Sequence, residues 1–233
     1  MTATRALTGG ELTPGDVWAV AVERAPAPDL AESAREAMTA ARELVERVAH
    51  GSSEHTYGVN TGFGRFVSKQ IPEEQTEELQ LRLLRSHACG VGEPYPDEVV
   101  RAAMLLRANA LAKGNSGARI ETVELLLACL ERGVLPRVPA RGSVGASGDL
   151  APLAHLALPL VGEGEAWYGG ELQTGGDALR QAGLEPVRLA AKEGLSLING
   201  TQFMAAQGAL GLVRARRLAK AADCACALSL EAL

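Results

Sequence analysis

Aromatic residues are scarce in this chain of 233 residues, since phenylalanine, tryptophan and tyrosine together make up only 3% of it. A β-sandwich core draws heavily on aromatic and β-branched side chains, so that fold is disfavoured. Hydrophobic residues nevertheless reach 47%, and alanine, leucine and valine supply most of them. These side chains suit close packing between helices. The composition therefore predicts a mainly α-helical domain.

Other features that the chain lacks limit the kinds of partner that it is expected to bind. The formal net charge is −5, which argues against a nucleic-acid surface. No apolar run is long enough to span a bilayer, and no basic-then-apolar segment opens the chain, so we expect a cytoplasmic protein without a membrane partner. The few cysteines form no metal-ligand pattern and are expected to be free thiols, and no metal is predicted. They are Cys89, Cys129, Cys224 and Cys226.

Apolar residues recur at helical spacing in several segments, and glycine and proline separate them. The predicted helices lie at about 29–48, 72–89, 97–112 and 118–131, then from 149, at 177–182, and from 201 to the end. Residues 165–173 predict a small β-hairpin around Gly169-Gly170. One strand or a turn-rich lead-in is expected within 1–27, and irregular loops at 134–148 and 195–202. We expect one domain over 1–233, cut within the long helix that starts near 201, because that helix ends without a cap.

The most informative stretch is GSVGASGDL, at 142–150. The amide nitrogen of Gly148 can attack the carbonyl carbon of Ala146 and close a five-membered ring through Ser147. Loss of that water and then of the Ser147 hydroxyl leaves an exocyclic methylene, a strong electrophile made from the chain itself. Glycine leaves the attacking nitrogen unhindered and permits unusual dihedral angles. The surrounding fold must enforce such a backbone.

Three other interpretations of this stretch fit the residues less well. An Ala-Ser-Gly triplet alone is usually a turn. A serine-hydrolase elbow, G-x-S-x-G, fails at its fifth position, which is Asp149, and His155 is too close downstream to complete it. A phosphate-binding P-loop needs a lysine that this loop lacks.

The longer string GSVGASGDLAPLAHL resembles the signature of the aromatic amino acid ammonia-lyase family, whose members form this methylidene-imidazolone electrophile. The resemblance implies that Ala146, Ser147 and Gly148 supply the group, and that no dissociable cofactor is needed. It extends over almost the whole chain. Three further segments carry it, in the same order as in the family.

HTYGVNTGFG, at 55–64, is a glycine-rich loop that could close over a site and exclude water. A phenol has a pKa of about 10, so Tyr57 needs assistance to act as a base. By resemblance, Tyr57 is the base that removes the β-proton of the substrate. In LRSHACGVGEP, at 84–94, Ser86-His87 resembles the histidine-specific members, so His87 is expected to contact a substrate imidazole. In LINGTQ, Asn199 corresponds to an active-site residue near the substrate.

The resemblance implies elimination of ammonia from L-histidine to give trans-urocanate, by a homotetramer with sites assembled from several subunits. A tyrosine or phenylalanine ammonia-lyase, or an aminomutase, would use the same electrophile and remains open. So does a non-catalytic helical assembly fragment that keeps the motifs as loops. Family chains continue well beyond this point into a C-terminal helical region that supplies further active-site residues. This chain lacks that region, so the activity of the short chain is itself open.

Overall fold

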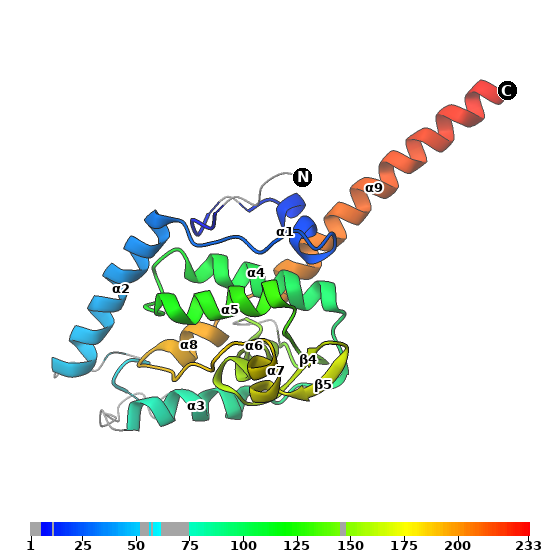
Figure 1. The fold of residues 1–233 in the computed structure, drawn as a ribbon. Coiled ribbons are helices and arrows are strands. Elements are labelled where there is room, and N and C mark those ends of the chain that lie inside the picture. Colours follow the sequence, from blue (N-terminus) through cyan, green and yellow to red (C-terminus); the bar gives the residue numbers. More distant parts are fainter. Residues whose placement is uncertain (1–5, 11, 52–55, 57, 62–74, 145–147) are drawn as a thin grey trace.

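The computed structural model describes residues 6–10, 12–51, 56, 58–61, 75–144 and 148–233. Helices are the dominant element of these segments (Figure 1). The helices are α1 (Pro14–Ala21), α2 (Glu32–Gly51), α3 (Thr76–His87), α4 (Asp97–Leu111), α5 (Ile120–Arg132), α6 (Leu150–Ala157), the 3-10 helix η3 (Leu158–Val161), α7 (Gly175–Gln181), α8 (Glu193–Ile198) and α9 (Gln202–Ala232). The strands are β1 (Val91–Pro94), β2 (Leu135–Pro136), β3 (Pro139–Arg141), β4 (Glu165–Tyr168) and β5 (Glu171–Thr174). The prediction of a mainly α-helical fold is confirmed.

Helix α4 forms the centre of the core, where it packs against α1, α5 and the first part of α9. In Figure 1, α4 and α5 run side by side through the middle of the molecule. Ala102, Ala103 and Ala108 of α4 are completely buried. Small side chains at a contact let helix axes approach closely. This explains how a chain with so few aromatic residues builds a dense core.

Helix α9 has two very different halves. Its first turns are buried through Phe203, Ala206 and Leu210, whereas the remainder projects beyond the other elements (Figure 1). Leu218 and Leu228 on the projecting part are each 72% exposed. None of the helices in the described part of the chain combines the length and apolar character that a membrane crossing requires.

The strands are short and antiparallel. β4 and β5 form the predicted hairpin, with Tyr168 paired to Glu171 across the turn, so that prediction is confirmed. β2 adds to the edge of β4, and β3 pairs with β1. The expectation of a wholly irregular loop at 134–148 is therefore wrong in part. The extended backbone of this segment finds partners distant in sequence, as in the 2.8 Å hydrogen bond from the Tyr95 amide to the Val138 carbonyl.

The strand or turn-rich lead-in expected within 1–27 is also wrong in part, because residues 14–21 form the helix α1. Thr13 accepts a hydrogen bond from the Asp16 amide, and the Asp16 carboxylate accepts one from the Thr13 amide, which together form a capping box. Pro14 occupies the first helical position, where its missing amide hydrogen costs nothing.

The loop expected at 195–202 is shorter than predicted, since Leu195 to Ile198 belong to α8. Leu197 and Ile198 are fully buried, and the helical backbone supplies hydrogen bonds for this buried segment. The residue that precedes the helix, Lys192, has a positive φ of 74°. Burial, rather than any local sequence pattern, stabilises this short helix.

Candidate active site

The predicted site residues fall into two groups. Gly148, His87 and Asn199 lie in described segments, whereas Tyr57, Ala146 and Ser147 lie outside the described residues. The chain just after Tyr57 is buried where it is described, with Val59 only 4% exposed and Thr61 only 1% exposed. This segment therefore packs against the rest of the molecule, directly beside a predicted catalytic position.

Gly148 packs directly against the turn that follows Asn199. Its φ is +123°, a conformation that favours glycine, and a Cβ there would lie only 2.4 Å from the Gly200 carbonyl oxygen. The next amide, that of Asp149, donates a 2.6 Å hydrogen bond to the same oxygen. The structure thus brings the last residue of the predicted electrophile beside the predicted substrate-binding turn, although 50 residues separate them in sequence.

Asp149 directly precedes α6, at the position where an N-cap residue stands. Its side chain makes no capping hydrogen bond to α6. Instead, one carboxylate oxygen accepts hydrogen bonds from the amides of Phe203 and Met204, at 2.9 and 3.0 Å. The other oxygen accepts one from the Ser143 hydroxyl at 2.8 Å. Asp149 is completely buried and caps α9 in the manner of an N-terminal acid.

The buried guanidinium of Arg107 also holds the Asn199 turn in place. One terminal nitrogen of Arg107 donates to the Asn199 carbonyl at 3.0 Å and to the Gln202 side-chain oxygen at 2.9 Å. Burial lowers the pKa of Arg107 to about 10, so the guanidinium stays charged at neutral pH. A Cβ at Gly200 would come within 2.3 Å of that nitrogen. With its carbonyl held in this way, Asn199 keeps an exposed side chain.

The ring of His87 is oriented by the helix that it ends. Its Nδ1 lies 2.9 Å from the Leu83 carbonyl oxygen and 3.0 Å from the Ser86 hydroxyl. The Ser86 hydroxyl itself donates to the Leu83 carbonyl at 2.9 Å. Because a carbonyl can only accept, we assign the proton of the neutral ring to Nδ1. The Nε2 atom of His87 is then a hydrogen-bond acceptor.

The segment after His87 lies beside the segment that leads into the triplet. Strand β1 pairs with β3, so that Val91 is opposite Arg141. At the next position a Cβ on Gly142 would lie 3.1 Å from the Gly90 Cα. Three of the four sequence motifs are therefore brought together in the described chain.

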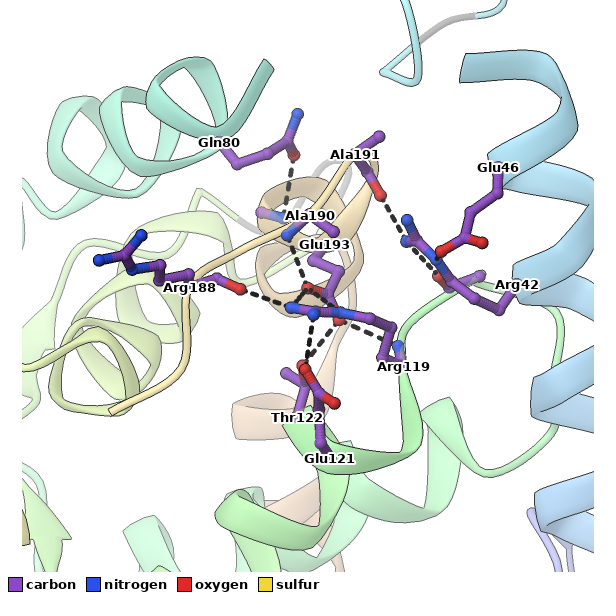
Figure 2. Close-up of polar contacts among 12 residues, drawn as sticks. Arg42, Glu46, Gln80, Arg119, Glu121, Thr122, Arg188, Ala190, Ala191 and Glu193 are labelled. Carbon is purple, nitrogen blue, oxygen red and sulfur yellow. Dashed lines mark hydrogen bonds and ion pairs between the residues drawn. The ribbon is translucent and has the colours of Figure 1, made fainter. Parts of the chain in front are cut away.

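A polar cluster that the sequence did not reveal anchors the helix before Asn199. Glu193 is fully buried at the start of α8 and forms an ion pair with Arg119 at 2.7 Å (Figure 2). Its carboxylate also accepts hydrogen bonds from the Thr122 hydroxyl at 2.7 Å and from the amides of Arg119 and Ala190 at 2.9 and 2.8 Å. In the sequence Lys192-Glu193 reads as an ordinary polar pair, since no local pattern distinguishes a buried acid from an exposed one.

Side chains of α2 and α3 also make hydrogen bonds to the start of α8 (Figure 2). Arg42 of α2 donates to the Ala191 carbonyl at 2.9 Å, and the Gly194 amide donates to the Gln80 side chain of α3 at 3.0 Å. Helices α2, α3 and α5 thus all hold the start of α8. Within the described residues, no three His, Cys, Asp or Glu side chains are grouped so that they could hold a metal ion.

The described chain is mainly helical, and Gly148 of its glycine-rich segment lies against the turn formed by Asn199 and Gly200. Residues 12–233 match the family model described as aromatic amino acid lyase. The chain therefore belongs to the aromatic amino acid lyase family.

Individual relatives agree with this assignment. Histidine ammonia-lyase of Gloeobacter violaceus is 58% identical over 226 residues, covering 97% of this chain and 44% of that protein. The crystal structure of histidine ammonia-lyase from Trypanosoma cruzi matches with a TM-score of 0.87 and 44% identity, over 94% of this chain and 42% of that one. Pantoea agglomerans phenylalanine aminomutase matches with a TM-score of 0.85 and 35% identity, over 92% and 41%. The chain spans under half the length of these relatives.

Proposed function

We propose that this chain carries the N-terminal part of an active site that eliminates ammonia from L-histidine to give trans-urocanate. The observation that supports the proposal is the close approach of Gly148 to the Gly200 carbonyl, directly after Asn199. Family membership and the histidine ammonia-lyase relatives support the same reaction class. Residues 1–233 would form one domain, working in a cytoplasmic homotetramer.

Each predicted residue has a distinct role in this proposal. Ala146, Ser147 and Gly148 would form the methylidene-imidazolone group, which supplies an electrophile that assists departure of the amine. The positive φ of Gly148 and the lack of room for a Cβ there suit a tightly folded backbone of this kind. Tyr57 would remove the β-proton as a general base. Asn199 would bind the amino acid part of the substrate through its exposed amide.

The orientation of His87 favours a substrate whose ring can donate a hydrogen bond, as histidine can and phenylalanine cannot. With its Nδ1 proton directed to the Leu83 carbonyl, the ring offers Nε2 as an acceptor. An imidazole substrate has a ring N–H that can donate to this atom, whereas a phenylalanine ring has none. A site that hydrogen-bonds its substrate discriminates strongly against an analogue that lacks the partner group.

A second candidate is a lyase or aminomutase that acts on tyrosine or phenylalanine through the same electrophile. The likeness to phenylalanine aminomutase favours keeping it. The third candidate, a non-catalytic helical assembly fragment, is favoured by the exposed leucines of α9.

The first experiment is the intact mass of the purified chain, followed by peptide mapping. We expect a deficit of two water molecules, located in the peptide that contains Ala146, Ser147 and Gly148. The Ser147→Ala variant is the matched control and should lose at most one water molecule, because ring closure can release one but alanine has no hydroxyl to release as the second. A full mass for the unmodified chain would refute the electrophile and favour the assembly fragment.

Substrate class is tested in the complete enzyme by turnover of L-histidine, L-tyrosine and L-phenylalanine, with and without the His87→Leu change. We expect histidine turnover to fall by about 100-fold or more, the order found when a polar partner of the substrate is lost. The mass deficit should be unchanged in this variant, which separates substrate binding from formation of the electrophile. Histidine turnover that persists in His87→Leu would favour the second candidate.

A further inference from the structure

His155 makes a contact that helix packing alone does not explain. It lies on α6, the helix that follows the triplet, and its Nε2 accepts a 3.0 Å hydrogen bond from the backbone amide of Gly90. An imidazole nitrogen can accept only when it carries no proton, so the ring is neutral in this state, with its proton on Nδ1.

The Gly90 backbone is held closely between α6 and β3. A Cβ at Gly90 would lie 3.2 Å from both Cδ2 and Nε2 of His155 and 3.3 Å from the Pro139 Cβ. These separations are tighter than ordinary van der Waals contact, so the ring fits against a bare backbone. Any larger residue at position 90 would displace the ring or the turn.

Gly90 lies in the turn that immediately follows His87. Helix α3 ends at His87, and the Ala88 amide donates to the Leu84 carbonyl at 3.0 Å as the helix cap. The Cys89 amide donates to the His87 carbonyl at 2.8 Å. The position of Gly90 therefore fixes the path by which the chain leaves His87.

We propose that His155 is a positioning residue, which holds His87 in place by accepting the hydrogen bond from the Gly90 amide. The functional meaning of this contact rests on the substrate-binding role proposed for His87. The contact couples the helix that follows the predicted electrophile to the predicted substrate-binding histidine.

The surroundings of His155 favour the neutral ring that this contact requires. Burial lowers the pKa of His155, and the positive charge of Arg137 lowers it further, while Glu165 opposes this effect. Arg137 and Glu165 also pair with each other at 3.1 Å. On the clamped segment itself, His87 and Cys89 are the titratable side chains. A pKa below the ordinary value of 6.5 keeps His155 neutral at pH 7.

The lowered pKa of His155 determines how its contribution to stability depends on pH. Because the unfolded chain binds the His155 proton more readily than the folded chain, this group lowers stability as the pH falls below about 6.5. The loss levels off once the pH is below the pKa of the folded state. Protonation of the folded chain also removes the acceptor, so the Gly90 hydrogen bond and the position of His87 are lost as the pH falls through the lowered pKa of His155.

The test uses the ¹⁵N-labelled chain and nuclear magnetic resonance, and needs no turnover. The Gly90 amide resonance should follow the titration of His155 in the unmodified chain. In His155→Gln, whose side-chain oxygen can accept the same hydrogen bond, the titration should vanish while Gly90 stays protected from hydrogen exchange. In His155→Leu, which has no acceptor, exchange at Gly90 should be about fivefold faster. The His87 ring resonances should move in His155→Leu and not in His155→Gln.

A Gly90 amide that does not respond to pH, or equal His87 spectra in the Gln and Leu variants, would overturn the proposal. If His155→Leu does not fold, the pH titration of Gly90 in the unmodified chain still decides the matter. These outcomes are separate from the proposed function. Loss of the mass deficit, or histidine turnover that is indifferent to His87→Leu, would refute that function and leave the Gly90 titration as it is.

Discussion

Two buried carboxylates, Asp149 and Glu193, hold the two sides of the Asn199 turn in different ways. Both are completely buried. Glu193 is balanced by the guanidinium of Arg119 and begins the helix that ends just before Asn199. Asp149 makes no ion pair within the described segments; its charge is balanced by two amides at the start of α9 and by the Ser143 hydroxyl.

The difference shows two ways of making a buried charge tolerable. A full opposite charge offsets desolvation only if every partner stays in place, and removing one partner leaves an uncompensated ion. Helix N-terminal amides carry a smaller partial charge, and a neutral acceptor can satisfy them almost as well. The Glu193 side of the turn should therefore depend strongly on charge, and the Asp149 side mainly on the presence of an acceptor.

Glu193→Gln is expected to have the largest effect, a loss of about 3 kcal/mol in the free energy of unfolding. The change leaves Arg119 without its buried counter-charge. The backbone amides of Arg119 and Ala190 donate to different carboxylate oxygens of Glu193. Glutamine replaces one of these oxygens with an NH₂ group, which then faces a backbone N–H that can only donate. Urea unfolding followed by circular dichroism measures the loss.

Glu121→Gln is the matched control for that experiment. Glu121 pairs with the same arginine at 2.5 Å, but its side chain is 59% exposed. Exposed pairs of this kind contribute about 0–1 kcal/mol. If the two variants lost equal stability, burial would not be what distinguishes the partners of Arg119.

Asp149→Asn should cost less, about 1 kcal/mol, although the residue is equally buried. The asparagine oxygen can accept from Phe203 and Met204, while its amide donates to the Ser143 hydroxyl, which can accept as well as donate. Asp149→Ala removes the acceptor altogether and should cost about 2 kcal/mol. Hydrogen exchange at the amides of residues 203 and 204 should accelerate in the alanine variant and change little in the asparagine variant. A larger loss for Asp149→Asn than for Glu193→Gln would reverse the comparison.

The smallest effect is expected at Gly208, which lies on the exposed side of α9, away from both Glu193 and Asp149. No described atom lies within 4 Å of a Cβ built there. Gly208→Ala should therefore raise the free energy of unfolding by about 0.5–1 kcal/mol, because alanine favours the helix. Gly200→Ala is the contrasting variant, since its Cβ would lie 2.1 Å from the Gln202 side-chain oxygen. Thermal unfolding should show opposite signs for the two changes.

Local patterns in the sequence predicted most of the helices, the hairpin at Gly169-Gly170 and the family. They failed where long-range contacts decide the structure. The capping box at Thr13 is a local signal that could have identified α1. By contrast, nothing near Glu193 indicates that Arg119, 74 residues away, makes the acid a buried anchor for α8. Asp149 directly precedes α6, yet its carboxylate accepts hydrogen bonds from α9, which begins 53 residues later.

The cap on α9 also has a consequence for the order of events during synthesis. Asp149 and Phe203 are 54 residues apart, and a ribosome adds about 5–20 residues per second. Asp149 is therefore made about 3–11 s before the amides that will donate hydrogen bonds to its carboxylate. Throughout that interval Asp149 is already part of the nascent chain, while its hydrogen-bond donors on α9 have not been translated. Its buried carboxylate therefore reaches its final partners late in synthesis.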